Sequence, residues 1–190
     1  MSADFAAARQ TMVESQVRTA DVTDLALQDA LRATPRERLL PAAKAFAAYA
    51  DVEVEYAPGR WLLKPRDVAK LLQALRPVAG ETALAIAAPY AAAVLEAMGL
   101  SVTRLDEGDL KRAPGGDYDL VVCEGAVARA PEAWTSALAL GGRLGVVERD
   151  GPAGRAMVYV RAADGVGGRA VFDASPPHLA GFEPVRGFAF

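Results

Sequence analysis

The residues best suited to chemistry are two carboxylates that follow predicted strands. Asp106 ends a strand about 20 residues after the preceding strand begins, and a carboxylate so placed can accept hydrogen bonds from both ribose hydroxyls of a nucleoside. Glu124 ends another strand, where a carboxylate needs solvent, a partner or a hydrogen bond and thereby marks a cleft. Taken by itself, the position favours a solvated aspartate at the start of a turn, and both alternatives stay open.

The turn between the first strand of the sheet and the next helix determines how a cofactor could be held. Nucleotide-type cofactors need backbone amides at close approach, which glycine usually provides. Residues 87–90 read Ala-Ala-Pro-Tyr. The alanine methyl groups therefore stand where a cofactor would approach, and Pro89 has no N–H to donate. The pattern therefore favours a tight apolar connection over a cofactor cradle. The candidate cofactor contacts are Asp106, Ala87, Tyr90, Glu124 and Gly125.

The other reactive residue types are scarce. The chain has a single cysteine, Cys123, and a single histidine, His178, so a disulfide framework and His- or Cys-based metal sites are excluded. Cys123 lies within an apolar run and is expected to be a buried, inert thiol. His178 has no evident base partner and is expected to be a structural or a surface residue. We assign no catalytic residue and no metal.

Composition limits the class of protein. The 190 residues are 52% hydrophobic and 24% charged, which suits a packed globular chain. A net charge of -3 provides no positive field for nucleic acid or anionic membranes. The N-terminal residues carry charges among alanines rather than a signal-peptide core, and no apolar run is long enough to span a bilayer. We expect a soluble, cytoplasmic protein.

The elements that position these residues change character along the chain. Residues 1–78 are predicted to form a helical region with short strands, including a helix that starts at Pro65 and ends near Arg76. Residues 79–190 alternate strands and helices, which predicts a parallel sheet flanked by helices, and the two parts are expected to form one compact unit. Strands are predicted at 82–87, 101–106, 118–124 and 143–148, helices at 90–98 and 131–140, and a hairpin around Asp164-Gly165.

A series of short motifs runs in a fixed order over residues 10–148. The motifs are Met12-Val13-Glu14, Gln16-Val17-Arg18, Val22, Asp24, Pro35-Arg36-Glu37, Leu40-Pro41, Ala48-Tyr49, Asp51, Pro65, Tyr118-Asp119, Gly125-Ala126-Val127, Pro131 and Gly141-Gly142-Arg143-Leu144. Their order resembles that of protein-L-isoaspartate O-methyltransferases. The resemblance implies an α/β, Rossmann-like class I methyltransferase fold with an N-terminal helical arm. It also implies S-adenosylmethionine as methyl donor and methyl esterification of isoaspartyl carboxylates in damaged proteins.

Three departures from that family fall on its chemistry. Residues 83–90 replace the acidic residue and glycine-rich loop, and Trp61-Leu62-Leu63 replaces a Thr-Ile-Ser-like segment. Only residues 107–117 stand where the family fits a helix and another strand, so the fold is expected to be trimmed by one strand–helix unit. We therefore predict a degenerate member with lost or much weakened S-adenosylmethionine binding, a pseudoenzyme or binding module. The alternative is an active carboxyl methyltransferase acting on isoaspartyl residues.

Partners are expected to be proteins. A missing strand–helix unit can leave apolar sheet surface uncovered, and the amphipathic N-terminal helix and Phe188-Ala189-Phe190 add apolar features. A two-fold homodimer is the commonest way to cover such a patch, and a protein or peptide partner is the other possibility considered. The alternative is that these phenylalanines fill the core of a monomer.

Overall fold

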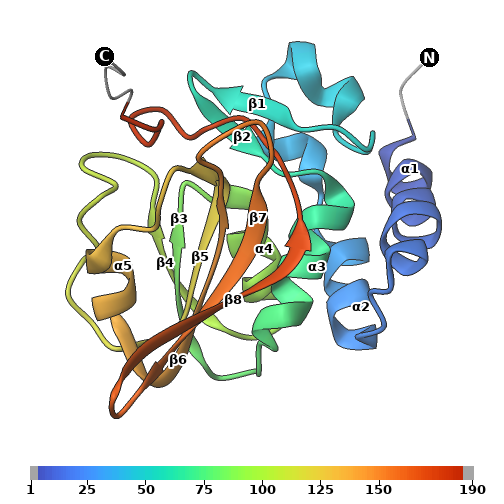
Figure 1. The fold of residues 1–190 in the computed structure, drawn as a ribbon. Coiled ribbons are helices and arrows are strands. Elements are labelled where there is room, and N and C mark those ends of the chain that lie inside the picture. Colours follow the sequence, from blue (N-terminus) through green and yellow to red (C-terminus); the bar gives the residue numbers. More distant parts are fainter. Residues whose placement is uncertain (1–3, 186–190) are drawn as a thin grey trace.

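The centre of the protein is a six-stranded sheet in the order β4-β3-β5-β6-β7-β8 (Figure 1). The computed structural model describes residues 4–185. The first four strands are parallel, and β7 and β8 are added antiparallel as a hairpin. This is the expected α/β architecture. The strands are β3 (Thr82–Ile86), β4 (Ser101–Leu105), β5 (Tyr118–Val127), β6 (Leu138–Glu148), β7 (Arg155–Ala162) and β8 (Gly165–Asp173).

Capping aspartates and prolines mark the residues at which the helices begin. Asp4 caps α1 (Phe5–Met12) and Asp24 caps α2 (Leu25–Ala33), each carboxylate accepting a backbone N–H of the first turn. Proline occupies the first position of α3 (Pro65–Leu75) and of α4 (Pro89–Ala97). The remaining helix is α5 (Glu132–Ser136), and β1 (Val54–Ala57) pairs with β2 (Arg60–Leu62) in a separate ribbon. No helix within residues 4–185 is long and apolar enough to cross a membrane.

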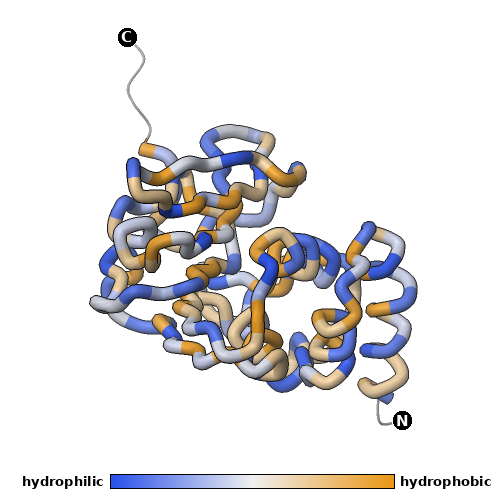
Figure 2. The backbone as a smooth tube through the Cα atoms, turned by 90° about the horizontal axis from the view of Figure 1, so that it is seen from below, coloured by the Kyte–Doolittle hydropathy of each residue, from blue (hydrophilic) through white to orange (hydrophobic). Residues whose placement is uncertain are grey.

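Two hydrophobic cores lie on opposite faces of the sheet. The first joins the N-terminal helices, α3 and α4 to one face, through side chains such as Leu31, Leu71 and Val122. The second surrounds the fully buried Trp134 on the α5 face. Apolar and hydrophilic residues alternate along the N-terminal helices (Figure 2), as helices with one buried face require. The first core combines residues from 1–78 and from 79–190.

The structure corrects the sequence prediction around Gly141 and Gly142. The predicted helix at 131–140 is only α5, and the predicted strand at 143–148 begins earlier, at Leu138. Both glycines lie inside β6 rather than between a helix and a strand. A Cβ on Gly142 would lie 2.7 Å from the carbonyl oxygen of Tyr118, so glycine here permits close approach of β6 to β5. Residues 42–47 form 3₁₀ turns.

The connection between β4 and β5 contains no helix or strand within the described chain, so β4 forms one edge of the sheet. The connection nevertheless covers the α5 face. Leu110 is buried in the second core, and its carbonyl oxygen accepts a hydrogen bond of 2.8 Å from Trp134 Nε1. The loop therefore covers the α5 face of the sheet, where a helix would otherwise pack. The outer edge of β4 has no neighbouring strand among the described residues.

Candidate functional site

Glu124 lies at the point where ligands bind in doubly wound sheets, at the carboxyl end of the central strands. Glu124 is fully buried. The carboxylate accepts a hydrogen bond of 2.7 Å from the N–H of Ala91, in the first turn of α4, and one of 3.1 Å from the N–H of Leu63. The predicted strand end at Glu124 is wrong, because β5 continues to Val127; Glu124 instead follows Cys123, the last β5 residue paired with β3, and its partners are backbone groups of the protein itself.

Arg36 completes this buried polar cluster. It is fully buried, donates a hydrogen bond to the carbonyl oxygen of Leu63 and places its guanidinium 4.6 Å from the centre of the Tyr90 ring. Its Nε and Nη1 atoms and the Tyr90 hydroxyl are buried without a hydrogen-bond partner within residues 4–185. Arg36, Tyr90, Leu63 and Glu124 together fill the space between the helical arm and the sheet.

Burial dominates the electrostatics of this cluster. Loss of solvent raises the pKa of Glu124, while the Arg36 guanidinium and the amide donors act in the opposite direction. Burial likewise raises the pKa of Tyr90 and lowers the pKa of Arg36. A charge in such a dry place is costly unless an opposite charge and hydrogen bonds offset the cost, so Arg36 and Glu124 depend on one another.

The turn from β3 to α4 uses its amides internally. Ala87 has a left-handed φ of 44° and donates its N–H to the carbonyl oxygen of Leu105 at 3.0 Å. Pro89 has no N–H, Ala91 donates to Glu124, and Ala92 donates to the carbonyl oxygen of Ala88 at 2.9 Å. These groups are therefore not available to a ligand in this conformation.

The candidate cofactor contacts lie in two different environments. Ala87, Tyr90, Glu124 and Gly125 are all buried, and Tyr90 and Glu124 belong to the filled cluster. Asp106 follows β4 and is half-buried. Burial raises its pKa, against the opposite effect of the Arg104 and Arg60 guanidinium groups. The residues that we expected to face one open cleft thus form a closed interior with one accessible carboxylate beside it.

Arg36 and Leu63 are the site residues that sequence reasoning missed. Arg36 was noted only within the motif Pro35-Arg36-Glu37, and Leu63 as a hydrophobic replacement for a hydroxyl residue. The Leu63 side chain is buried, whereas its backbone N–H and carbonyl oxygen hold Glu124 and Arg36. No spacing links Arg36 to Glu124, so only the fold brings them together.

Two other singled-out residues have structural roles. Cys123 is buried in β5, and burial raises the pKa of its thiol, which keeps it protonated and unreactive. The Nε2 atom of His178 lies 2.8 Å from the carbonyl oxygen of Arg149. Among residues 4–185 no group of three or more His, Cys, Asp or Glu side chains is arranged to hold a metal ion.

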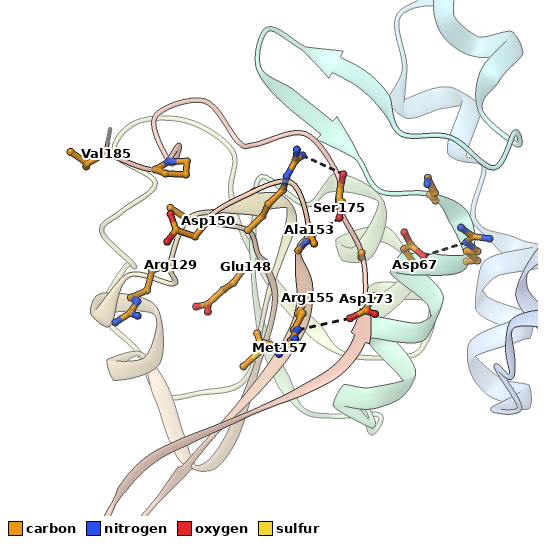
Figure 3. A pocket seen from close by; sticks show the side chains of 17 residues that line it. Asp67, Arg129, Glu148, Asp150, Ala153, Arg155, Met157, Asp173, Ser175 and Val185 are labelled. Atoms are coloured by element: carbon orange, nitrogen blue, oxygen red, sulfur yellow. Dashed lines mark hydrogen bonds and ion pairs between the residues drawn. The ribbon is translucent and has the colours of Figure 1, made fainter. Parts of the chain in front are cut away.

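An open pocket of about 930 Å³ lies elsewhere, beyond the ends of β5 and β6 (Figure 3). Side chains of both charges line it, among them Arg129, Glu148, Asp150 and Arg155, with Arg155 4.0 Å from Asp173. Glu148 accepts hydrogen bonds of 2.8 Å from the Tyr159 hydroxyl and from the N–H of Ala130. None of the candidate cofactor contacts lines this pocket.

Named sequences similar to this chain come from several bacteria. A protein-L-isoaspartate O-methyltransferase from Rhodopseudomonas palustris is 32% identical over 168 residues, which cover 74% of this chain and 69% of that protein. One of the same name from Methylorubrum populi is 30% identical over 179 residues, covering 80% of this chain and 84% of that protein. No protein-family model matches the chain.

Solved structures agree on the fold. A protein-L-isoaspartate O-methyltransferase structure covers 93% of this chain and 67% of its own length, with a TM-score of 0.72 and 16% identity. A Plasmodium falciparum structure of the same methyltransferase type, in complex with S-adenosyl-L-homocysteine, covers 90% of this chain and 97% of its own length. Its TM-score is 0.73 and its identity 14%. At these identities the likeness establishes the fold alone.

Proposed function

Because this chain belongs to the protein-L-isoaspartate O-methyltransferase family, we propose that it keeps the family fold but has lost or greatly weakened S-adenosylmethionine binding. It then acts as a pseudoenzyme or binding module. The observation that carries this proposal is the occupation of the α4 N-terminus by Glu124, whose carboxylate takes the N–H of Ala91 inside a solvent-free cluster.

The residues present do not fit the cofactor in this conformation. A nucleoside-bearing donor needs exposed amides beside the first strand, and the amides of Ala87, Ala91 and Ala92 are bonded within the protein. The Tyr90 ring and the Arg36 guanidinium fill the adjacent interior. Losing a few hydrogen bonds at roughly 1 to 3 kcal/mol each lowers affinity by several orders of magnitude. The half-buried Asp106 alone does not compensate.

Calorimetric titration of S-adenosylmethionine and S-adenosyl-L-homocysteine into the pure protein tests the proposal. We expect no saturable heat with either compound. Binding in the micromolar range that weakens on Asp106→Ala would overturn it, because that pattern requires the ribose contact of a working cofactor site. The Asp109→Ala variant is the matched control, since Asp109 is an exposed aspartate of the same loop.

The alternative function is an active S-adenosylmethionine-dependent carboxyl methyltransferase acting on isoaspartyl residues of damaged proteins. Family membership and the partly exposed Asp106 favour it. It requires the β3–α4 turn and Glu124 to rearrange when the donor binds. Transfer of a radiolabelled methyl group to an isoaspartyl peptide, and not to its aspartyl counterpart, would establish it. The absence of transfer at high protein concentration would exclude it.

The partner we propose is a second copy of the chain, associated about a two-fold axis. The support is the outer edge of β4, which has no neighbouring strand among the described residues and exposes Ser101, Thr103 and Arg104. Phe188 and Phe190, the other predicted contributors, lie outside the described residues.

The compartment we propose is the cytoplasm. Support comes from the single cysteine of the chain, Cys123, which is free and buried. Fractionation of cells producing the full chain tests this assignment, and recovery outside the cytoplasmic fraction would contradict it.

A further inference from the structure

We propose that Glu124 is an internal ligand. Its carboxylate occupies a carboxylate-binding site that the backbone amides of Leu63 and Ala91 form beside the buried guanidinium of Arg36, which itself donates to the carbonyl oxygen of Leu63. The site lies where this fold type binds its ligands. The Glu124 side chain of the same chain therefore occupies the position that a ligand would take. The inference rests on the proposed function in one respect, because it takes the cluster as closed in the native protein.

The amide part of the site has the chemistry of an anion site. Ala91 lies in the first turn of α4, where unpaired N–H groups and the helix dipole favour a negative charge. The residue before the helix, Ala88, has no side chain that can cap it. Glu124 supplies the missing acceptor from a different strand, at 2.7 Å. The Leu63 amide, from the segment before α3, holds the second carboxylate oxygen at 3.1 Å.

Arg36 provides the positive charge beside this site. Arg36 is fully buried, and its charge acts on Glu124, the carboxylate of the cluster. Two of its polar atoms, Nε and Nη1, have no hydrogen-bond partner within residues 4–185. Such a group is expensive to bury, and its Nη2 atom donates to the carbonyl oxygen of Leu63, the residue whose N–H binds Glu124. Two segments distant in sequence therefore contact one carboxyl group, and a buried guanidinium is fixed to one of them.

Removing the side chain should leave the site intact but empty. Glycine at 124 would leave the N–H groups of Leu63 and Ala91 without their acceptor, in a small cavity without solvent access. A small monocarboxylate such as acetate carries the same two oxygens as the lost side chain. Chloride carries the charge without that geometry, so it serves as the ionic-strength control.

The experiment measures urea unfolding of Glu124→Gly in sodium acetate and in sodium chloride of equal ionic strength. We expect acetate to raise the unfolding midpoint of the variant in a saturable manner and to leave the wild-type midpoint unchanged, because ligand that binds only the folded state stabilises it. If the variant does not fold in chloride, the yield of refolded protein in acetate against chloride is the readout. Equal effects of the two salts would overturn the proposal.

Two further variants make the result specific. Glu148→Gly removes a carboxylate that also accepts an amide and a hydroxyl hydrogen bond, but from a half-buried position, and acetate should not restore it. Adding Arg36→Met to Glu124→Gly should abolish the acetate effect. Rescue of Glu148→Gly to the same extent, or rescue that survives Arg36→Met, would show a general solvent effect and reject the site. The test contains no S-adenosylmethionine, so its failure is separate from that of the proposed function.

Discussion

At the scale of single residues, a buried carboxylate and a buried guanidinium occupy the interior of the candidate site, where a ligand would otherwise bind. Glu124 satisfies donors from two segments, and Arg36 sits against the ring of Tyr90. Sequence reasoning identified Glu124 as a residue that needs a partner, because a carboxylate at a strand end is rarely left alone. It did not identify the partner, because pairing between residues far apart in sequence depends on the completed fold.

Arg36→Met should strongly destabilise the protein. The change removes the guanidinium whose charge opposes the effect of burial on Glu124 and which donates to the carbonyl oxygen of Leu63, and removing one of two buried charged groups costs about 3–5 kcal/mol of the free energy of unfolding. Adding Glu124→Gln should restore part of that loss, because the unpaired charge is gone. Urea unfolding measures both variants. Arg38→Met is the control, since Arg38 is exposed and its loss should cost no more than about 0.5 kcal/mol. Equal costs at the two arginines would contradict the pairing.

The environment of the Tyr159 hydroxyl predicts that the protein loses stability at alkaline pH. Burial, together with the hydrogen bond to Glu148, raises the pKa of its hydroxyl from 10.0 to about 12. A folded-state pKa above the unfolded value gives a stabilising contribution that is complete below pH 10 and is lost as the pH rises through 12. The wild type should therefore lose its stability advantage over Tyr159→Phe across that range. Thermal unfolding midpoints of both proteins measure this, and parallel curves would contradict it.

At the scale of elements, regular patterns were predicted and irregular ones were not. The apolar spacing from Val68 to Leu75 predicted α3, and the continuous run after Tyr118 predicted β5. The early start of β6 was missed, because Gly141-Gly142 was interpreted as a helix breaker. Their role follows from close packing on β5, which local propensity does not show. Similarly, the short connection after β4 was predicted, but the way it covers the sheet was not.

Leu110→Ala tests whether that connection works as a covering element. The Leu110 side chain is buried in the core around Trp134, so truncation should lower the free energy of unfolding by about 2–4 kcal/mol. Arg112→Ala, in the same loop, changes an exposed side chain and should cost about 0.5 kcal/mol or less. Chemical denaturation compares the two. A small effect for Leu110→Ala would mean that the loop contributes little to the core.

At the scale of the whole molecule, the two edges of the sheet differ in what they offer a second copy. The outer strand β8 contains a register irregularity opposite Ala156 and Met157, and such bulges disturb edge pairing. The strand β4 pairs with β3 in unbroken register, and its outer edge is free. Of the two edges, β4 is therefore the better template for a two-fold contact.

A dimer through β4 would pair the strand with its own copy in antiparallel orientation about Thr103, with Val102 opposite the partner's Arg104. Five residues of strand bury too little area alone, so flanking parts must reach the roughly 1,200 Å² typical of stable interfaces. We expect a dimer mass by light scattering. Thr103→Lys should give a monomer, because it places like charges directly opposite one another.

Val166→Lys, on the exposed outer strand β8, is the matched control and should leave the dimer intact. Dissociation by Val166→Lys and not by Thr103→Lys would move the contact to the other edge of the sheet. A monomer mass for the wild type at high concentration would mean that β4 stays unpaired in solution. Its shortness and the charged Arg104, held by Glu96 at 2.8 Å, would then be the features that keep the edge from associating.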